Sequence, residues 1–345
     1  MVVRLLVLSL SLVAIAALPR PELHRFEAVE PHMGTLVRLT VYTPGEQAAG
    51  GAFRAAFDRI RDLDRILSDY RPDSELTRLS TIAVGRAVPV SEDLFAVLAA
   101  SHDLAEATDG AFDITQGPAI RLWREARKTA RAPDPAALRE AAGRSGFRKL
   151  HLDAEHRTVR LDVAGMMLDV GAIGKGYAAS EAIEVLGDLG VRSALAAVSG
   201  DLAFSEAPPG RRGWRIAIHS DDPSVVGVPG VLELTNAAVS TSGSSEQHVD
   251  IGGRRYSHII DPSSGMGLVD DVTVTVIAPH GLDADGLDTA ISVLGADRGL
   301  TLIESRPAAA ALIVQRTSAG TRVLPSSRFR ELAARRGVAS LKPEP

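Results

Sequence analysis

The chain has 345 residues, of which 45% are apolar and 23% are charged, so it is long and apolar enough to bury a full hydrophobic core. This composition excludes a disordered chain and a small disulfide scaffold. The formal net charge is −5 and no block of like charges occurs, which predicts no nucleic-acid partner. The absence of cysteine excludes thiolate catalysis, cysteine-ligated metals and a lipid anchor on an N-terminal cysteine.

Lysine is rare in this chain, because 34 of the 38 basic residues are arginine. Solvated positive charge is therefore supplied by arginine. A lysine inside a glycine-rich motif is a candidate functional residue in such a chain, and Lys175 has that position.

The N-terminal segment is apolar. A stretch of apolar residues and serine follows Arg4 over residues 5–18, and these fourteen residues match the core of an export signal but are short for a bilayer-spanning helix. Ala14 and Ala16 form an Ala-x-Ala cleavage pattern. The sequence predicts a signal peptide over residues 1–17 and an exported protein, periplasmic or at the outer face of the cytoplasmic membrane. An uncleaved membrane anchor is the alternative.

The hydrophobic pattern predicts helices and strands without a regular strand–helix–strand alternation. Helical spacing occurs over 53–67 and again after Ser91, a good N-cap, with Gly110 close to the end of that second helix. Strands are expected over 36–42, 150–152, 159–162, 167–170, 214–219, 231–234, 256–260 and 272–277, with a hairpin turn at 208–210. The expected fold class is α+β, a single compact domain with largely antiparallel or mixed sheets flanked by helices.

A glycine-rich turn leads into an amphipathic helix. Residues 168–177 read Leu-Asp-Val-Gly-Ala-Ile-Gly-Lys-Gly-Tyr, so backbone N–H groups and a helix N-terminus are presented together. Such a turn suits a phosphate group, and Lys175 can neutralise a pyrophosphate. The pattern is neither a Walker A loop nor a Gly-x-Gly-x-x-Gly fingerprint, and a purely structural tight turn is the alternative.

An acidic helix start lies within residues 281–295. Asp285, Asp288 and Thr289 stand at positions i, i+3 and i+4 and therefore share one face of the helix. Carboxylate and hydroxyl oxygens without imidazole or thiolate match a hard cation such as Mg²⁺. Capping of the helix and compensation of its dipole by the aspartates is the alternative interpretation.

A third polar region joins residues 241–248 to residues 256–265. Small polar side chains beside a strand that ends in Asp-Pro are typical of a rim around a ligand. A serine hydrolase is not favoured, because no Gly-x-Ser-x-Gly elbow precedes a helix. His258 is either a functional residue or a histidine whose hydrogen bonds are satisfied within its strand.

These three regions, in this order, resemble the ApbE family of FAD:protein FMN transferases. Further matches are Met33-Gly-Thr35, the segment 68–79 and the segment 110–118, so the resemblance covers residues 31–313 in six ordered motifs. It implies an ApbE-like flavin transferase domain over residues 28–315, followed by a C-terminal extension over residues 316–345.

Carried over position by position, the resemblance implies a site for FAD and Mg²⁺. The residues expected to contact FAD are Met33, Tyr70, Ala111, Phe112, Asp113, Asp169, Lys175 and Ile259. The expected metal ligands are the carbonyl of Ala172, the carboxylate of Asp285 and the hydroxyl of Thr289, with Asp288 as a further neighbour. The expected catalytic residues are Asp285, Lys175 and His258.

Two segments depart from the family pattern. Where the family commonly has Asn-Ile-Gly-Gly, this chain has Ala-Val-Ser-Gly at residues 197–200, so a polar side chain and one flexible glycine are missing. Where the family often has Ile-Ala-Lys-Gly, this chain has Ile-Gly-Lys-Gly at residues 173–176. The first departure bears on the position of the flavin or on the choice of acceptor.

The activity implied by the resemblance is Mg²⁺-dependent transfer of FMN from FAD to a Ser or Thr hydroxyl of an acceptor protein, with release of AMP. The acceptor would be a subunit of a membrane redox complex or an exported flavin-carrying reductase. Mg²⁺ and Lys175 would stabilise the charge of a phosphoryl-transfer transition state, and His258 or an aspartate near the metal would accept the hydroxyl proton. A Mg²⁺-dependent FAD pyrophosphatase that gives FMN and AMP, and a flavin-binding protein without turnover, are the alternatives.

Overall fold

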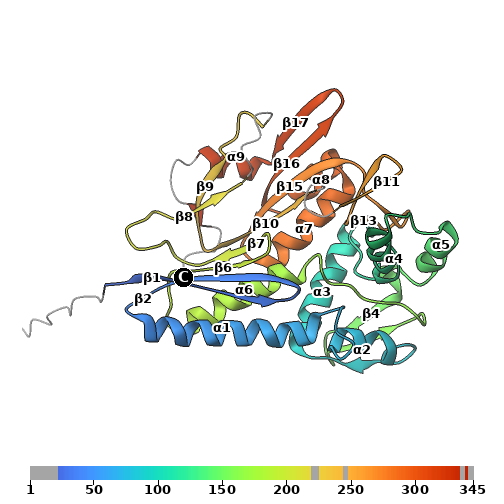
Figure 1. The fold of residues 1–345 in the computed structure, drawn as a ribbon, viewed down its shortest axis with the longest axis horizontal. Helices are drawn as coiled ribbons and strands as arrows, with labels where there is room; N and C mark the ends of the chain where they lie inside the picture. Colours follow the sequence, from blue (N-terminus) through green and yellow to red (C-terminus); the bar gives the residue numbers. More distant parts are fainter. Residues whose placement is uncertain (1–21, 219–224, 244–247, 335–338, 341–345) are drawn as a thin grey trace, which may run out of the picture.

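An eight-stranded antiparallel sheet forms the centre of the fold (Figure 1). The computed structural model describes residues 22–218, 225–243, 248–334 and 339–340. The strand order is β1-β2-β6-β7-β10-β15-β16-β17, and every neighbouring pair is antiparallel. The strands are β1 (His24–His32), β2 (Thr35–Thr43), β6 (Ala194–Val198), β7 (Asp201–Phe204), β10 (Ala237–Gly243), β15 (Asp271–Ala278), β16 (Ala310–Thr317) and β17 (Gly320–Pro325).

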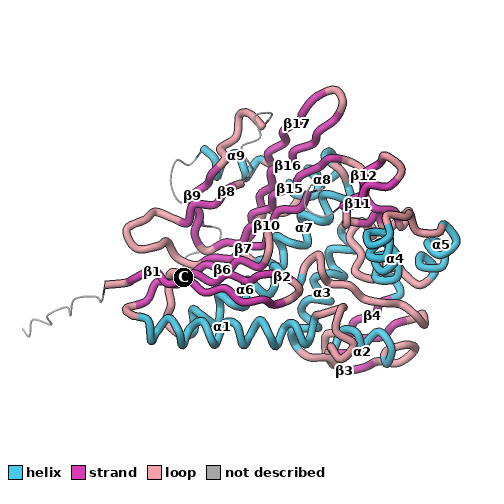
Figure 2. Tube along the Cα trace, viewed as in Figure 1, coloured by secondary structure: helices cyan, strands magenta, loops and turns pink. Residues whose placement is uncertain are grey.

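Helices cover one face of this sheet, and Figure 2 shows them as a layer beneath and beside the strands. They are α1 (Glu46–Leu67), α6 (Gly174–Asp188), α7 (Gly281–Leu294) and α8 (Ala296–Glu304), and α3 (Glu92–Ala107) packs against α1 and α7. The largest hydrophobic core lies between these helices and the sheet, and it takes alternate residues of β2, namely Val37, Leu39 and Val41. This alternation fixes which face of the sheet turns toward α6 and α7.

A smaller three-stranded sheet and a helix cover part of the opposite face. The sheet has the order β18-β9-β8, with β8 (Trp214–Ala217), β9 (Val231–Thr235) and β18 (Ala339–Ser340), and the helix is α9 (Ser327–Ala334). The strand β16 is buried on both faces. Ala311 and Ile313 belong to the core under the helices, whereas Leu312 and Val314 belong to the core under β8, β9 and α9.

The remaining elements lie around α3 and α4 at one end of the molecule. They are α2 (Glu75–Ile82), α4 (Gly117–Thr129), α5 (Pro135–Gly143), a 3₁₀ turn (Phe147–Lys149), β3 (Val88–Pro89), β4 (Leu150–Asp153), β5 (Thr158–Leu161), β11 (His248–Ile251), β12 (Arg254–Ser257), β13 (Ile260–Asp261) and β14 (Met266–Gly267). Trp123 of α4 donates its indole N–H to the carbonyl of Gly265 (2.8 Å) and packs against Tyr256. This contact holds the segment that carries His258 and Ile259 against α4.

The expected α+β class with largely antiparallel sheets flanked by helices is confirmed. The helix predicted after Ser91 is α3, and the Ser91 hydroxyl accepts a hydrogen bond from the N–H of Leu94 (3.3 Å) as an N-cap. The helix predicted over 53–67 is α1, which begins earlier, at Glu46.

Several predicted strands differ from those in the structure. Residues 167–170 form no strand and make one isolated bridge, between Met167 and Gln116, because the chain turns there into α6. The strand predicted over 256–260 is interrupted by a bend at His258 and Ile259, which separates β12 from β13. The turn at 208–210 joins strands of two different sheets, so it is not a hairpin turn. The strand predicted over 214–219 ends at Ala217, and His219 lies outside the described residues.

The two ends of the expected domain fall inside strands. β1 begins at His24, before residue 28, and β16 crosses residue 315. In the described part of residues 316–345, β17 pairs with β16, and Phe329 and Leu332 of α9 are buried. The predicted signal peptide over residues 1–17 lies outside the described residues. Among the described residues, no helix is both long and apolar enough to cross a membrane.

Candidate active site

The helices α6 and α7 touch through two glycines. A Cβ atom on Gly176 would overlap the carbonyl oxygen of Gly281 and would lie 2.7 Å from the Cβ of Asp285, and a Cβ atom on Gly281 would overlap the backbone of Gly176. The N–H of Gly281 donates to the hydroxyl of Ser180 in α6 (2.8 Å). Only glycine permits this approach of two backbones, and the approach brings the first turns of both helices to one place.

Three aspartates lie together at this crossing. Asp285 and Asp288 come from the first two turns of α7, and Asp201 is the first residue of β7. One carboxylate oxygen from each lies within 4.8 Å of the others, and all three side chains are buried. The backbone N–H of Gly176 donates to Oδ2 of Asp285 (2.9 Å), which fixes that carboxylate against the start of α6.

Lys175 supplies the positive charge of this cluster. Its Nζ lies 2.7 Å from Oδ2 of Asp201 and 3.5 Å from Oδ2 of Asp285. Burial lowers the pKa of Lys175, but the attraction of Asp285 and Asp201 outweighs burial, so the pKa lies above its ordinary value. The ammonium group therefore stays protonated and can face a phosphate as a fixed charge.

Two hydroxyl groups bind the two carboxylate oxygens of Asp288. Ser240 of β10 donates to Oδ2 of Asp288 (2.6 Å) and also contacts Oδ1 of Asp201. The hydroxyl of Thr289 donates to Oδ1 of Asp288 (3.2 Å). The predicted metal ligands Asp285 and Thr289 thus meet in one cluster, and Asp288 lies inside it.

The charge balance of the cluster favours a bound cation. One ammonium group faces three buried carboxylates, and burial together with the charge of Asp201 raises the pKa of Asp285 to about 7. Burial and the charge of Asp285 raise the pKa of Asp288 well above its ordinary value. A divalent cation would remove this repulsion, and Mg²⁺ prefers oxygen ligands such as these. The residues of the cluster therefore fit Mg²⁺.

The carbonyl of Ala172 is the remaining expected metal ligand. Ala172 lies two residues before α6, whose N-cap is Ile173. Gly176 is in the first turn of that helix, where N–H groups have no acceptor within the helix, and its N–H donates to Asp285. The carbonyl of Ala172 therefore belongs to the turn that directly precedes Lys175 and α6.

A second charged group lies at the beginning of the glycine-rich turn. The buried carboxylate of Asp169 accepts hydrogen bonds from the N–H of Gly171 (2.9 Å) and from Nη2 of Arg124 (2.7 Å). Arg124 also pairs with Asp69, and its guanidinium lies 4.2 Å from the centre of the Tyr70 ring. Burial, together with the charge of Asp69, raises the pKa of Asp169 to about 6. Tyr70 and Asp169, two of the expected FAD contacts, are thus joined through Arg124.

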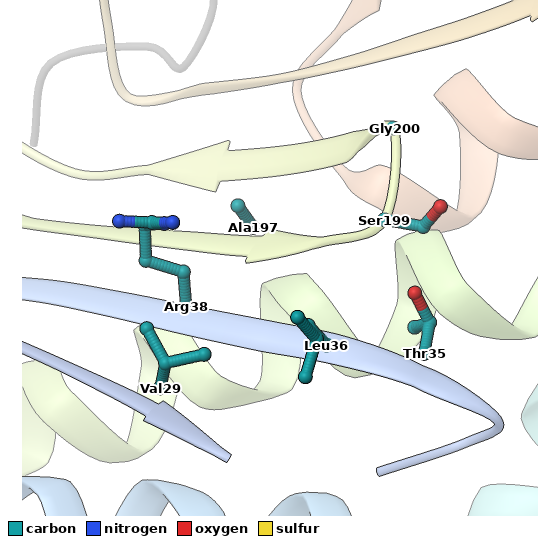
Figure 3. A pocket seen from close by; sticks show the side chains of 7 residues that line it. All are labelled: Val29, Thr35, Leu36, Arg38, Ala197, Ser199 and Gly200. Carbon is teal, nitrogen blue, oxygen red and sulfur yellow. The ribbon is translucent and has the colours of Figure 1, made fainter. Parts of the chain in front are cut away.

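A shallow groove begins at Met33 and follows β2. Its first part is lined by residues 31–36 together with Asp64, and its second part has a volume of about 480 Å³. Figure 3 shows the second part, in which Leu36 lies between Arg38 at one end and Thr35 and Ser199 at the other. The groove therefore leads from Met33 to the turn that directly precedes Asp201.

The turn between β6 and β7 carries the departure from the family pattern. Ser199 has a φ of 58°, in the left-handed region that favours glycine, at a position where the family commonly has glycine. Ala197, where the family commonly has asparagine, lines the groove without a polar group. Glycine adopts this left-handed backbone without strain, which explains why the family commonly has glycine at position 199. Serine adopts the same backbone only at a conformational cost.

The segment Ala111–Asp113 follows α3 and is largely engaged within the protein. Phe112 is 2% exposed and belongs to the core under the helices. The carboxylate of Asp113 accepts hydrogen bonds from the N–H (2.8 Å) and the hydroxyl (2.7 Å) of Thr115. The N–H of Asp169 donates to the carbonyl of Ile114 (2.8 Å), so this segment lies beside the start of the glycine-rich turn.

His258 and Ile259 form the bend between β12 and β13. Ile259 is buried and its N–H donates to the hydroxyl of Ser257 (3.2 Å), whereas His258 is half-buried. Residues 244–247 of the third polar region lie outside the described residues. In the described part of that region, the hydroxyl of Ser242 contacts the carbonyl of Asp288 (3.2 Å), so β10 borders the aspartate cluster.

Sequence reasoning missed Asp201 and Ser240. Asp201 stands at an inward position of β7, with Ala203 as the next inward residue. An aspartate on the buried face of a strand needs a partner, so its position in a strand marks it as a candidate site residue. This signal could not be used for Asp201 or Ser240, because no strand was predicted at 201–204 or at 237–243.

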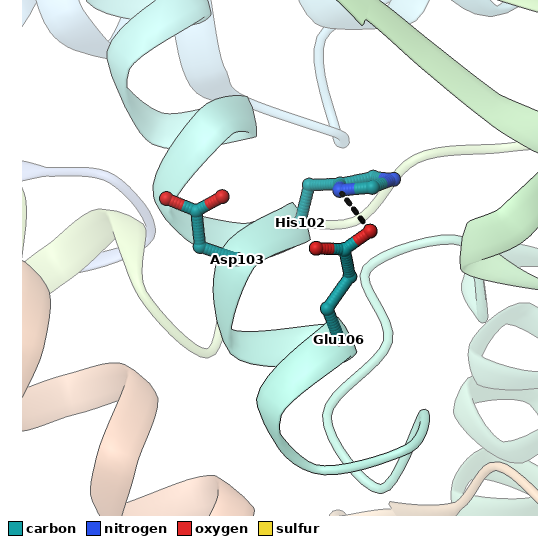
Figure 4. A group of neighbouring side chains, drawn as sticks. All are labelled: His102, Asp103 and Glu106. Atoms are coloured by element: carbon teal, nitrogen blue, oxygen red, sulfur yellow. Dashed lines mark ion pairs between the residues drawn. The ribbon is translucent and has the colours of Figure 1, made fainter.

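A second group of possible metal ligands lies on α3. The side chains of His102, Asp103 and Glu106 are close together, and Figure 4 shows the ion pair between His102 and Glu106 (3.8 Å). Asp103 and Glu106 are exposed, and neighbouring turns of one helix bring acidic side chains together without any ligand. We assign no site to this group.

The fold and the site define an α+β protein with a cluster of three buried carboxylates at the start of a lysine-bearing helix. A model described as the ApbE family matches residues 33–313. The chain therefore belongs to the ApbE family.

Two similar proteins are both named FAD:protein FMN transferase. A FAD:protein FMN transferase of Treponema pallidum is 34% identical over 312 residues, which cover 86% of this chain and 86% of that protein. A FAD:protein FMN transferase of Klebsiella pneumoniae is 32% identical over 289 residues, 82% of each chain.

Solved structures of the family have the same fold. The flavin transferase ApbE from Vibrio cholerae matches with a TM-score of 0.81 and 27% identity, over 90% of this chain and 99% of that chain. The apo form of the flavinyl transferase ApbE from Pseudomonas stutzeri matches with a TM-score of 0.78 and 32% identity, over 92% of this chain and 99% of that chain.

Proposed function

We propose that this protein is a FAD:protein FMN transferase that requires Mg²⁺ and links FMN to a Ser or Thr hydroxyl of an acceptor protein. The names of its relatives support the transferase activity. One observation supports the chemistry most directly: three buried aspartates and one lysine meet where the glycine-rich turn enters α6. This arrangement suits the transfer of a phosphoryl group, which demands positioned positive charge and little covalent chemistry from the protein.

The proposed metal ligands are the carboxylate of Asp285, the hydroxyl of Thr289 and the carbonyl of Ala172, with Asp288 beside them. When bound, Mg²⁺ supplies positive charge against the phosphate oxygens of FAD. Asp201 and Ser240 are proposed as positioning residues: Asp201 binds Lys175, and Ser240 binds both Asp201 and Asp288.

The proposed reaction is a substitution at the FMN-side phosphorus of FAD. The acceptor oxygen forms a bond to this phosphorus, and the bond from the phosphorus to the oxygen shared with AMP breaks. AMP leaves with that oxygen, and the hydroxyl proton of the acceptor passes to His258 or to an aspartate of the cluster. Lys175 stabilises the negative charge that grows on the phosphate oxygens.

The proposed flavin contacts lie on both sides of the glycine-rich turn. Met33 borders the groove along β2, Asp169 opens the turn and Lys175 follows it. The further proposed contacts are Tyr70, the Ala111–Asp113 segment and Ile259. The segment 111–113 would meet FAD mainly through its backbone and Ala111, since the side chains of Phe112 and Asp113 are already engaged.

We propose that the protein is exported and works in the periplasm or at the outer face of the cytoplasmic membrane. The apolar stretch over residues 5–18 and the Ala-x-Ala pattern support this location. The proposed acceptor is a subunit of a membrane redox complex or an exported reductase, which would meet the enzyme in the same compartment.

One assay tests the activity. The purified protein is incubated with FAD, Mg²⁺ and a candidate acceptor, and both AMP and acid-stable flavin fluorescence on the acceptor are followed. AMP together with labelled acceptor supports the transferase. AMP and free FMN without labelled acceptor would instead identify a FAD pyrophosphatase. FAD binding without any AMP would leave a flavin-binding protein and contradict both enzymatic activities.

A further inference from the structure

Arg124 joins three segments that are far apart in the sequence. It lies on α4, whereas Asp69 and Tyr70 lie between α1 and α2, and Asp169 begins the glycine-rich turn. Its Nη1 pairs with Asp69, its Nη2 lies 2.7 Å from Oδ2 of Asp169, and its guanidinium lies over the ring of Tyr70, 4.2 Å from the ring centre. Only a planar guanidinium offers two separate nitrogens and a face at the same time, so a lysine could not make these three contacts together.

The ion pairs of Arg124 are shielded from water, whereas the ring that it covers is not. Asp169 is buried, and the side chains of Arg124 and Asp69 are largely buried, so salt screens these pairs less than it screens surface pairs. Tyr70 is 73% exposed, the largest exposed fraction among the exposed large apolar side chains of the described residues. Because the guanidinium covers one face of the ring, the open surface of Tyr70 is its other face and its edge.

A tyrosine ring held in this way is ordered before any ligand arrives. An exposed side chain ordinarily exchanges between rotamers, and a ligand that orders it loses binding free energy. Here the same guanidinium binds Asp69, the residue directly before Tyr70, and covers the ring itself. Its second nitrogen binds Asp169, which is hydrogen-bonded to Gly171 in the turn that leads to Lys175. The ring of Tyr70 is therefore fixed relative to that turn.

We propose that Arg124 is a positioning residue, which holds the ring of Tyr70 beside the glycine-rich turn so that its open face stacks on a flat ring of FAD. This inference rests on the proposed function, in which Tyr70 and Asp169 contact FAD. Arg124 itself is engaged by two carboxylates and by the tyrosine ring, so it acts on FAD through Tyr70. Stacking on an aromatic side chain suits any flat heterocycle.

A double-mutant cycle on FAD affinity tests this role. The dissociation constant of FAD is measured by flavin fluorescence in the wild type, Arg124→Gln, Tyr70→Ala and the double variant. Arg121→Gln removes an exposed arginine from the same helix and is the matched control. Thermal unfolding shows whether each variant folds. If Arg124→Gln does not fold, because two carboxylates lose their cation, Arg124→Lys keeps the charge without the fork and takes its place in the cycle.

Tyr70→Ala should weaken FAD binding about tenfold, because the stacking contact is lost. Arg124→Gln should weaken FAD binding about fivefold when Tyr70 is present and less than about twofold in the Tyr70→Ala background, since it acts through that ring. Arg124→Lys should recover part of the loss. FMN, which lacks the adenine, identifies the stacked ring: it shows the same dependence on Arg124 if that ring is the flavin and none if it is the adenine.

The inference is overturned if Arg124→Gln weakens FAD binding by the same factor in both backgrounds, as a merely structural role would. It is also overturned if Arg124→Gln binds FAD within about twofold of Arg121→Gln. A wild-type protein that binds FAD but releases no AMP would contradict the proposed function, and the dissociation constants would still decide the role of Arg124.

Discussion

The backbone N–H of Gly176 donates to the carboxylate of Asp285 over 2.9 Å, so the start of α6 and the acidic face of α7 form one unit. This hydrogen bond gives a partner to an N–H of the first turn of α6, and Oδ2 of the same Asp285 lies 3.5 Å from Nζ of Lys175. The geometry of the site therefore depends on how closely the two helices approach, and their approach depends on Gly176 and Gly281.

Gly176→Ala should destabilise the protein by roughly 1–3 kcal/mol or more, because the added methyl group meets the backbone of α7, which has no room to move. Gly51→Ala is the matched control. It lies in the second turn of α1 with no atom within 4 Å of its added Cβ, and should stabilise the protein by about 0.5–1 kcal/mol. Chemical denaturation measures both. Equal stability of the two variants would show that the helices do not need this close contact.

Asp288→Asn should raise the stability of the metal-free protein, on the order of 1 kcal/mol, because it removes one of three buried carboxylates that repel one another. The same variant should gain less stability from added Mg²⁺ than the wild type does. Thermal unfolding in EDTA and in Mg²⁺ measures both effects. The exposed Asp103→Asn is the control and should change neither value. A metal-free Asp288→Asn protein less stable than the wild type would contradict the repulsion inferred for this cluster.

Asp169 should make stability depend on pH near its raised pKa. Its pKa rises from an ordinary value of 3.8 to about 6, so between these values the folded protein holds more protons than the unfolded chain. The free energy of unfolding of the wild type should therefore fall as pH rises from about 4 to about 6, relative to Asp169→Asn, by about 1.4 kcal/mol for each unit of the pKa difference. Denaturation at several pH values tests this, and a constant difference between the two proteins would be the contrary result.

Ser199→Gly should stabilise the protein by about 0.5 kcal/mol. Glycine adopts the left-handed backbone without the conformational cost that serine bears, and the greater entropy of glycine in the unfolded chain offsets part of this gain. Ser199→Ala should bring no such gain, since alanine has the same conformational cost. Urea unfolding compares the three proteins. If alanine stabilised as much as glycine, the backbone of this turn would not be the reason.

Local patterns in the sequence predicted the elements that have strong signals of their own. The helix over 53–67 repeats apolar residues at helical spacing, Ser91 caps α3, and the strand over 272–277 alternates Val with Thr. These features act within a few residues of the chain. They are therefore readable without knowledge of what packs against them.

Strands of the central sheet with weak local signals were missed. β6 has the sequence Ala-Leu-Ala-Ala-Val, which has little intrinsic preference for a strand, and it forms because β2 and β7 flank it on both sides. The end of β16 and the strand β17 lie beyond the boundary expected at residue 315, because pairing rather than periodicity makes them strands.

The candidate site was predictable where its residues belong to motifs and not where they come together only in space. Asp285, Thr289 and Lys175 stand in patterned segments of α7 and α6. Asp201 and Ser240 reach the same cluster from separate strands, and contacts between residues 39 and 48 positions apart have no signature in a single sequence.

The central claim is that Asp285 and Thr289 hold Mg²⁺ for the transfer of FMN, and a magnesium titration of turnover tests it most directly. AMP release from FAD is measured in wild-type protein, Asp285→Ala and Thr289→Val, with FAD affinity measured in parallel by flavin fluorescence. Mg²⁺-dependent turnover should be lost in both variants, by about a hundredfold or more, while FAD affinity stays largely intact. Turnover at the wild-type rate and with the wild-type Mg²⁺ dependence in either variant would contradict the assignment.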